Sequence, residues 1–174
     1  MNGQVLFHNE EIYFGDNIPA EVKHVLLEAT RVYPDLEKTE TFLEQAYQMA
    51  PTQLEVYYAR YKFYFYNKRL VQAEQVAREG LQQAALQAGF AADWNELDEA
   101  TANWGTPNDT ERFYLYTLKA LAFISMRQEK FNAAENILSK LSQLDKLDQV
   151  GSSVVMEILQ GLKESCEEAN EEAA

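Results

Sequence analysis

The feature that most constrains the fold is a set of amphipathic segments that recur in pairs along the 174-residue chain. Within each segment, apolar residues return every three or four positions, which is the period of a helix with one buried face. The chain has only 7 Gly and 4 Pro, too few of the residues that punctuate many short strands. We therefore expect an all-α fold, with helices at about 19–33, 36–49, 54–66, 70–88, 110–126, 131–144 and 152–163.

The helical pairs also repeat with a fixed period. The second helix of the first pair is expected to begin at Leu36 and that of the second pair at Leu70, thirty-four positions later. In the third pair the second helix is expected to begin at Phe131. This start is twenty-seven positions later than the period predicts, and twenty-seven is the length of the insertion at 88–114. Three positions after each of these starts stands a small residue: Thr39, Ala73 and Ala134. Thirty-four is the period of a known helical repeat.

This pattern resembles the tetratricopeptide repeat (TPR) family over about 100 residues. The resemblance implies a right-handed superhelix of helical hairpins in a single domain at 19–163, with an acidic tail at 164–174 and an N-terminal arm at 1–18. Its repeats fall at 20–53, 54–87 and 115–148, its insertion at 88–114 and its capping helix at about 152–163. The chain departs from the family at the turn glycine, replaced by Pro34, Lys68 and Glu129. The alternative is an ordinary helical bundle whose hairpins share no period.

A second departure from the family pattern predicts how the two helices of the second repeat pack together. Where the family has a small residue in the first helix, the second repeat has Tyr61. A ring at this position needs small neighbours at native packing density, and the paired helix supplies Ala73, Ala77 and Gly80.

The resemblance implies that the first helices of the repeats line a concave groove that binds a segment of another protein. The run 57–66 has seven aromatic residues in ten, which is more than one helix face can bury. Its rings form two faces separated by about 90°. The second face either packs against neighbouring helices or lines the groove. The groove candidates are Tyr58, Lys62, Phe65, Tyr66, Lys119, Phe123, Met126, Arg127, His24, Glu28 and Arg31.

Charge favours an apolar ligand that carries acidic groups. Residues 54–81 have five basic and three acidic side chains, a balance of +2 that leaves −15 for the rest of the chain. Lys62 and Lys119 stand four residues from an aromatic side chain, so cations and rings alternate along the predicted groove. TPR proteins that dock chaperones grip a carboxylate with Lys and Asn, whereas the matching positions here hold His24, Glu28 and Ala59, which disfavours that subclass.

The insertion at 88–114 contains Trp94 and Trp104 among several acidic residues. We expect a short helix at about 92–102, followed by a turn at 105–107. The two indoles either cover the joint between the second and third repeats or form a lid over the groove.

Composition argues against several function classes. A net charge of −13 opposes nucleic acid and anionic membranes, and no apolar run is long enough to span a bilayer. The sequence starts with neither a basic region nor a long apolar run, and its single cysteine, Cys166, cannot form an internal disulfide, so we expect a cytoplasmic protein.

Motifs for chemistry are missing as well. His8 and His24 are isolated, and the chain has no phosphate-binding loop and no nucleophile with a partner base. The carboxylate pairs, such as Glu10-Glu11, are better explained as solvated surface. We expect no metal, no cofactor and no catalysis.

The sequence therefore predicts a non-catalytic protein-interaction module that binds a peptide or helix of a partner protein in an aromatic-lined groove. A sharper form is an assembly or secretion chaperone, because small acidic proteins with three such repeats are similar to the type III secretion chaperones that hold translocators. The alternative is a structural subunit that dimerises through the aromatic face, and the sequence leaves open whether the chain is a monomer or a homodimer.

Overall fold

The computed structural model describes the backbone of residues 18–172 and the side chains of residues 18–166. This part of the chain is all-helical, as predicted, with seven α-helices and no strand. The predicted arm at 1–18 lies outside it except for Ile18. The helices are α1 (Ala20–Val32), α2 (Leu36–Met49), α3 (Leu54–Tyr66), α4 (Leu70–Ala88), α5 (Asp109–Arg127), α6 (Phe131–Leu144) and α7 (Ser152–Glu172).

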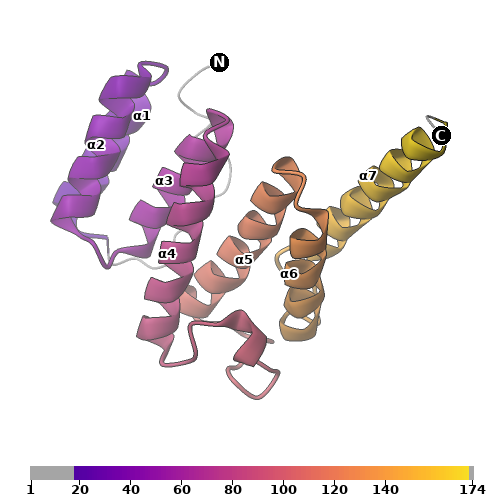
Figure 1. Cartoon of the computed structure of the whole chain (residues 1–174). Coiled ribbons are helices and arrows are strands. Elements are labelled where there is room, and N and C mark those ends of the chain that lie inside the picture. Colours follow the sequence, from indigo (N-terminus) through magenta and orange to yellow (C-terminus); the bar gives the residue numbers. More distant parts are fainter. Residues whose placement is uncertain (1–17, 173–174) are drawn as a thin grey trace.

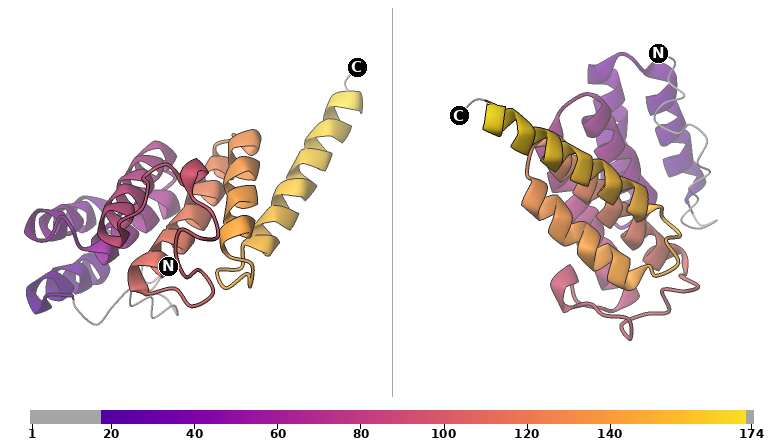
Figure 2. Two further views of the ribbon diagram at one scale, coloured as in Figure 1. Left: turned by 90° about the horizontal axis from the view of Figure 1, so that it is seen from below. Right: turned by 90° about the vertical axis from the view of Figure 1, so that its right-hand side faces the viewer.

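Consecutive helices form antiparallel hairpins that stand side by side (Figure 1). The odd-numbered helices run in one direction and the even-numbered helices return in the other, and a second view shows the hairpins following one another in chain order (Figure 2). The closest packing joins α3 to α4, α4 to α5, and the two helices of each outer hairpin. α5 also contacts α3 and α7, so three odd-numbered helices lie along one side of the molecule.

Local signals fix most helix ends close to the predicted positions. The Asp35 side chain accepts a hydrogen bond from the Lys38 amide at 3.1 Å and so caps α2. Asn108 and Glu111 form a reciprocal capping box at the start of α5. α4 ends at Gly89, whose φ of 76° is a left-handed conformation that glycine adopts readily.

The turns at Lys68 and Glu129 have the same backbone geometry although neither contains glycine. Lys68 has φ 60° and Glu129 has φ 62°. In each turn the next amide bonds to a carbonyl five residues back, from Arg69 to Tyr64 and from Lys130 to Ser125, at 2.9 Å. Lys68 and Glu129, which stand where the TPR pattern has a turn glycine, therefore both adopt a left-handed backbone conformation that side chains disfavour.

The core runs through all three hairpins. Tyr114, Phe63 and Phe113 are among the largest fully buried side chains. The residues three positions after the starts of α2, α4 and α6 are each fully buried: Thr39, Ala73 and Ala134.

A polar cluster links the first hairpin to the second. The Arg69 guanidinium donates two hydrogen bonds to the Glu40 carboxylate, at 2.5 and 2.9 Å, and the Tyr64 hydroxyl donates a third at 3.0 Å. These donors, Arg69 first, hold the pKa of Glu40 below its usual range because they stabilise the ionised carboxylate. The cluster thereby favours one placement of α2 against α3.

The structure corrects two boundaries. The insertion forms only a short 3-10 helix, η2 (Trp94–Glu96), in place of a helix at 92–102. The reason is that the side chains of Asp93 and Asp98 accept hydrogen bonds from amides two residues ahead, which favours turns over helix. α7 continues to Glu172, beyond the predicted end near 163, because no proline follows Gly161 and glutamate favours helix.

The insertion packs against the joint between the second and third hairpins. Trp104 is 4% exposed, donates its indole N–H to the Asp98 carbonyl at 2.9 Å, and packs against Phe90 and Tyr114. Trp94 is partly buried under the guanidinium of Arg78. The structure therefore favours the packing interpretation of the insertion over the lid.

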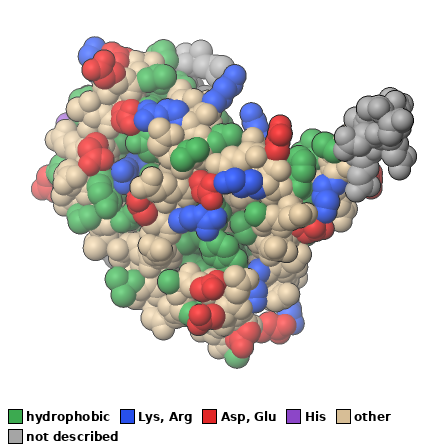
Figure 3. Space-filling model, in the orientation of Figure 1, with side chains coloured by type: hydrophobic (Ala, Val, Ile, Leu, Met, Phe, Trp, Pro, Cys, Tyr) green, Lys and Arg blue, Asp and Glu red, His purple; other side chains and the backbone are tan. Residues whose placement is uncertain are grey.

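The surface drawn in Figure 3 intersperses charged groups of both signs with small apolar patches. In the described part of the chain, none of the helices is both long and apolar enough to cross a bilayer.

Candidate binding groove

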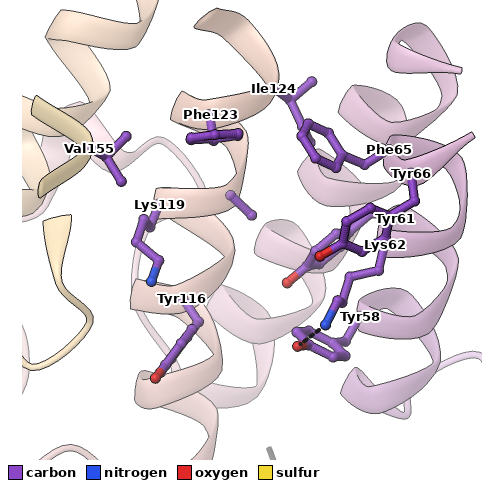
Figure 4. A pocket seen from close by; sticks show the side chains of 11 residues that line it. Tyr58, Tyr61, Lys62, Phe65, Tyr66, Tyr116, Lys119, Phe123, Ile124 and Val155 are labelled. Atoms are coloured by element: carbon purple, nitrogen blue, oxygen red, sulfur yellow. Dashed lines mark hydrogen bonds between the residues drawn. The ribbon is translucent and has the colours of Figure 1, made fainter. Parts of the chain in front are cut away.

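A hollow of about 320 Å³ lies between α3 and α5 and reaches the first turn of α7 (Figure 4). α3 and α5 each present one longitudinal face to it. The lining residues are Tyr58, Tyr61, Lys62, Phe65, Tyr66, Tyr116, Lys119, Ala120, Phe123, Ile124 and Val155, and we call this set the groove.

Six of the predicted groove residues come together here. Four lie on α3 and two lie on α5, where the side chains of the two helices face one another across the hollow (Figure 4). They are Tyr58, Lys62, Phe65, Tyr66, Lys119 and Phe123. The second aromatic face of α3 therefore lines the groove and also contacts α5. The sequence left open whether this face packs against a neighbouring helix or lines the groove, and the structure shows that it does both.

The remaining candidates lie elsewhere. Met126 is 4% exposed and belongs to the core, so its assignment to the groove is wrong. Its spacing of three positions from Phe123 agrees with the groove face, but α5 packs against α3, α4, α6 and α7, so a helix with this many neighbours buries Met126 in the core. Arg127 stands beside the groove, with its guanidinium carbon 5.8 Å from the centre of the Phe65 ring.

The α1 candidates do not line the groove. His24 and Arg31 are exposed on α1, and Arg31 forms an ion pair with Glu28 in the same helix. The hollow is bounded by α3, α5 and α7 instead, because α1 packs mainly against α2.

Sequence reasoning missed five lining residues. Tyr116 and Ala120 are seven and three positions before Phe123, a helical spacing that could have revealed them. The packing expectation places Tyr61 against the small residues of α4, whereas the structure shows that it also lines the groove. Ile124 and Val155 carry no such signal, since Val155 reaches the groove only through the packing of α7 against α5.

Edge-to-face ring contacts fix the walls. The rings of Phe65 and Phe123 meet across the groove with centroids 5.7 Å apart. Along α3, Phe65 contacts Tyr66 at 5.6 Å and Tyr58 contacts Tyr61 at 5.4 Å. Such contacts hold aromatic side chains in preferred orientations, so the groove presents largely preformed apolar walls.

Two lysines give the groove its charge. The Lys62 ammonium donates a hydrogen bond to the Tyr58 hydroxyl at 2.9 Å and lies 4.8 Å from the centre of that ring. The Lys119 ammonium donates to the Val150 carbonyl at 2.5 Å and lies 4.8 Å from the Tyr116 ring. The lining includes no aspartate or glutamate, so it is positive in a chain of net charge −13.

The lining chemistry suits binding. Among its residues are tyrosine hydroxyls and two ammonium groups, but no Ser, Cys or His that could pair as nucleophile and base. Across the part of the chain that the structure describes, no group of three or more His, Cys, Asp or Glu side chains could hold a metal ion.

Comparison with known proteins finds a relative of unknown role. The chain is 28% identical over 155 residues to an uncharacterised 19.8 kDa protein in the nifW 5′ region of Azotobacter chroococcum mcd 1. The match covers 88% of this chain and 86% of that protein. No family model matches the sequence, and no solved structure matches it either.

Proposed function

We propose that this protein is a non-catalytic interaction module that binds a peptide or helix of a partner protein in the groove. The observation that carries the proposal is the lining itself, in which aromatic walls enclose two lysines without a carboxylate. Aromatic side chains are frequent anchors of protein interfaces, and a preformed concave surface lowers the entropy lost on binding. The favoured ligand is an apolar segment that carries Asp or Glu.

A TPR-like solenoid, with α7 as its capping helix, is the architecture that we propose for this module. Support comes from the helix starts, since both α1 to α3 (Ala20 to Leu54) and α2 to α4 (Leu36 to Leu70) advance by thirty-four positions. In such a solenoid the first helices of successive hairpins line one surface, and the groove joins α3, α5 and α7 in this way. A cytoplasmic assembly or secretion chaperone is the sharper form of the proposal.

Selection of displayed peptides on the immobilised full chain tests this function. We expect enriched peptides to combine an aromatic or aliphatic residue with Asp or Glu. A Phe65→Ala/Phe123→Ala variant should retain them on the order of ten-fold less well, because it removes the two rings that meet across the groove.

Matched controls are available on α4. Val71 and Leu86 are 73% and 76% exposed and lie outside the groove, so Val71→Ala/Leu86→Ala should retain the peptides as the unaltered chain does. Circular dichroism verifies that each variant is helical. Equal retention by a folded Phe65→Ala/Phe123→Ala variant would contradict the proposal, and sedimentation shows whether the aromatic face instead joins two copies.

A further inference from the structure

The charge of the groove is opposite to that of the chain that forms it. Its lining contains Lys62 and Lys119 and no carboxylate, and Arg127 stands at its edge. The chain as a whole has 28 acidic and 15 basic side chains. Segments of this same chain that are apolar and acidic therefore complement the groove.

Residues 1–17 have this chemistry. Their sequence contains two apolar clusters, Val5-Leu6-Phe7 and Ile12-Tyr13-Phe14. Three acidic residues, Glu10, Glu11 and Asp16, accompany the clusters, and the segment has no lysine or arginine. Apolar groups could enter the aromatic walls while the carboxylates approach the two ammonium groups, which lie over aromatic rings.

The point of attachment and the length of the segment also fit. The described chain begins at Ile18, just before α1, and α1 runs parallel to α3 (Figure 1). The segment is therefore tethered at the end of the molecule where α3 and α5 begin. Its 17 residues can span about 50 Å when extended. α3 has 13 residues and is about 20 Å long, so the tether reaches along the whole groove.

We propose that residues 1–17 bind in the groove of their own chain and are the competitor that a partner segment must displace. A tethered segment acts at a high effective concentration, so even weak contacts suffice for occupancy. The apparent affinity for a partner then scales with the fraction of chains whose groove is free. This regulatory part of the inference rests on the proposed function, whereas the occupancy itself does not.

Carbodiimide coupling of the full chain tests occupancy without any partner. The reagent joins a lysine amine to a carboxylate in direct contact as an amide, with loss of water, and peptide mapping by mass spectrometry identifies the pair. Two ion pairs at 2.9 Å serve as positive controls, Lys163 with Glu135 and Lys130 with Glu74. Lys68, exposed in the turn between α3 and α4, reports random coupling.

We expect Lys62 or Lys119 to couple to Glu10, Glu11 or Asp16 several-fold more than Lys68 does. In a mixture of ¹⁵N-labelled and unlabelled chains, the coupled peptides should carry a single isotope, because both partners belong to one chain. Equal coupling at Lys68 would overturn the inference. So would mixed-isotope pairs, since a second copy would then supply the segment.

A segment variant separates this inference from the proposed function. Glu10→Gln/Glu11→Gln/Asp16→Asn should abolish the coupling and raise retention of displayed peptides several-fold. Selected peptides without coupling to residues 1–17 would overturn the inference and leave the proposed function standing. Coupling to residues 1–17 without any selected peptide would overturn the proposed function and leave the occupancy standing. Coupling in the unaltered chain, with no gain in peptide retention by the segment variant, would overturn the regulatory part.

Discussion

Gly80 of α4 lies so close to Tyr57 of α3 that a Cβ atom built on the glycine would stand 3.1 Å from the tyrosine Cβ. The same atom would stand 3.2 Å from Cζ of Phe113 in α5. α4 therefore packs so closely against both α3 and α5 that little space is left there for a methyl group. α3 and α5 are also the two helices that form the groove walls, so the contact ties α4 to both of them.

Gly80→Ala should destabilise the fold by about 1–3 kcal/mol, because one neighbour of the new methyl group is the Tyr57 Cβ, which cannot rotate away. Chemical denaturation measures the change in the free energy of unfolding. Gly161→Ala is the matched control, since a Cβ there meets nothing within 4 Å. That variant should gain up to about 1 kcal/mol through helix propensity. Equal effects of the two changes would show that the Gly80 contact is not a constraint.

Glu40→Gln should cost about 1 kcal/mol at pH 7, because it weakens the partly exposed cluster with Arg69 and Tyr64. The unfolded pKa of a glutamate is about 4.3, and the folded pKa of Glu40 lies below it. The ionised carboxylate therefore makes its full contribution to stability above the unfolded pKa. This contribution is lost as the pH falls through the folded pKa. The difference between wild type and variant, measured by urea denaturation, should shrink below about pH 4.

The exposed Glu37 on the same helix supplies the comparison, and Glu37→Gln should change stability by less than about 0.5 kcal/mol. If Glu40→Gln behaves in the same way at every pH, the cluster does not join the hairpins energetically.

Glu129→Gly should stabilise the protein by about 0.5–1 kcal/mol, and Lys68→Gly should do so as well. Both residues have φ near 60°, where a side chain is strained and glycine is not. Gly89→Ala is the reciprocal test, because Gly89 has φ 76° and open space around it, so only the backbone opposes the methyl group. Thermal unfolding should show a loss for Gly89→Ala and gains for the other two. A loss of stability in Glu129→Gly and Lys68→Gly would mean that these two residues are not strained in the left-handed conformation.

Glu55→Gln should make stability less sensitive to pH. Glu55 is 6% exposed, and its Oε1 has no hydrogen-bond partner among the described residues, so burial raises its pKa. A raised folded pKa means that the native state binds the proton more tightly, so wild-type stability falls relative to the variant as the pH rises above about 4.3. At pH 7 the variant should be more stable by about 1 kcal/mol. Parallel stability curves between pH 4 and 7 would contradict this.

Helix positions could be predicted because their signals are local. Asp35 and Asn108 cap the helices that follow them, and Gly89 ends α4 near the predicted position. The insertion could not be predicted as well, because Asp93 and Asp98 bond to nearby amides in competition with a helix. Candidate groove residues were found where helical spacing sufficed, as for Lys119 and Phe123 on α5.

The sequence by itself determined that the chain forms paired amphipathic helices, that the first two pairs are offset by a constant spacing, and that one helix has aromatic side chains on two faces. Helical periodicity is a property of neighbouring residues, so it can be detected without knowledge of the fold. Only the tertiary structure decided which side chains line the groove. It buried Met126, placed Val155 beside α5, and set Gly80 against Tyr57, one turn before the predicted Tyr61. These outcomes depend on distances between helices, which follow from the packing of many side chains at once.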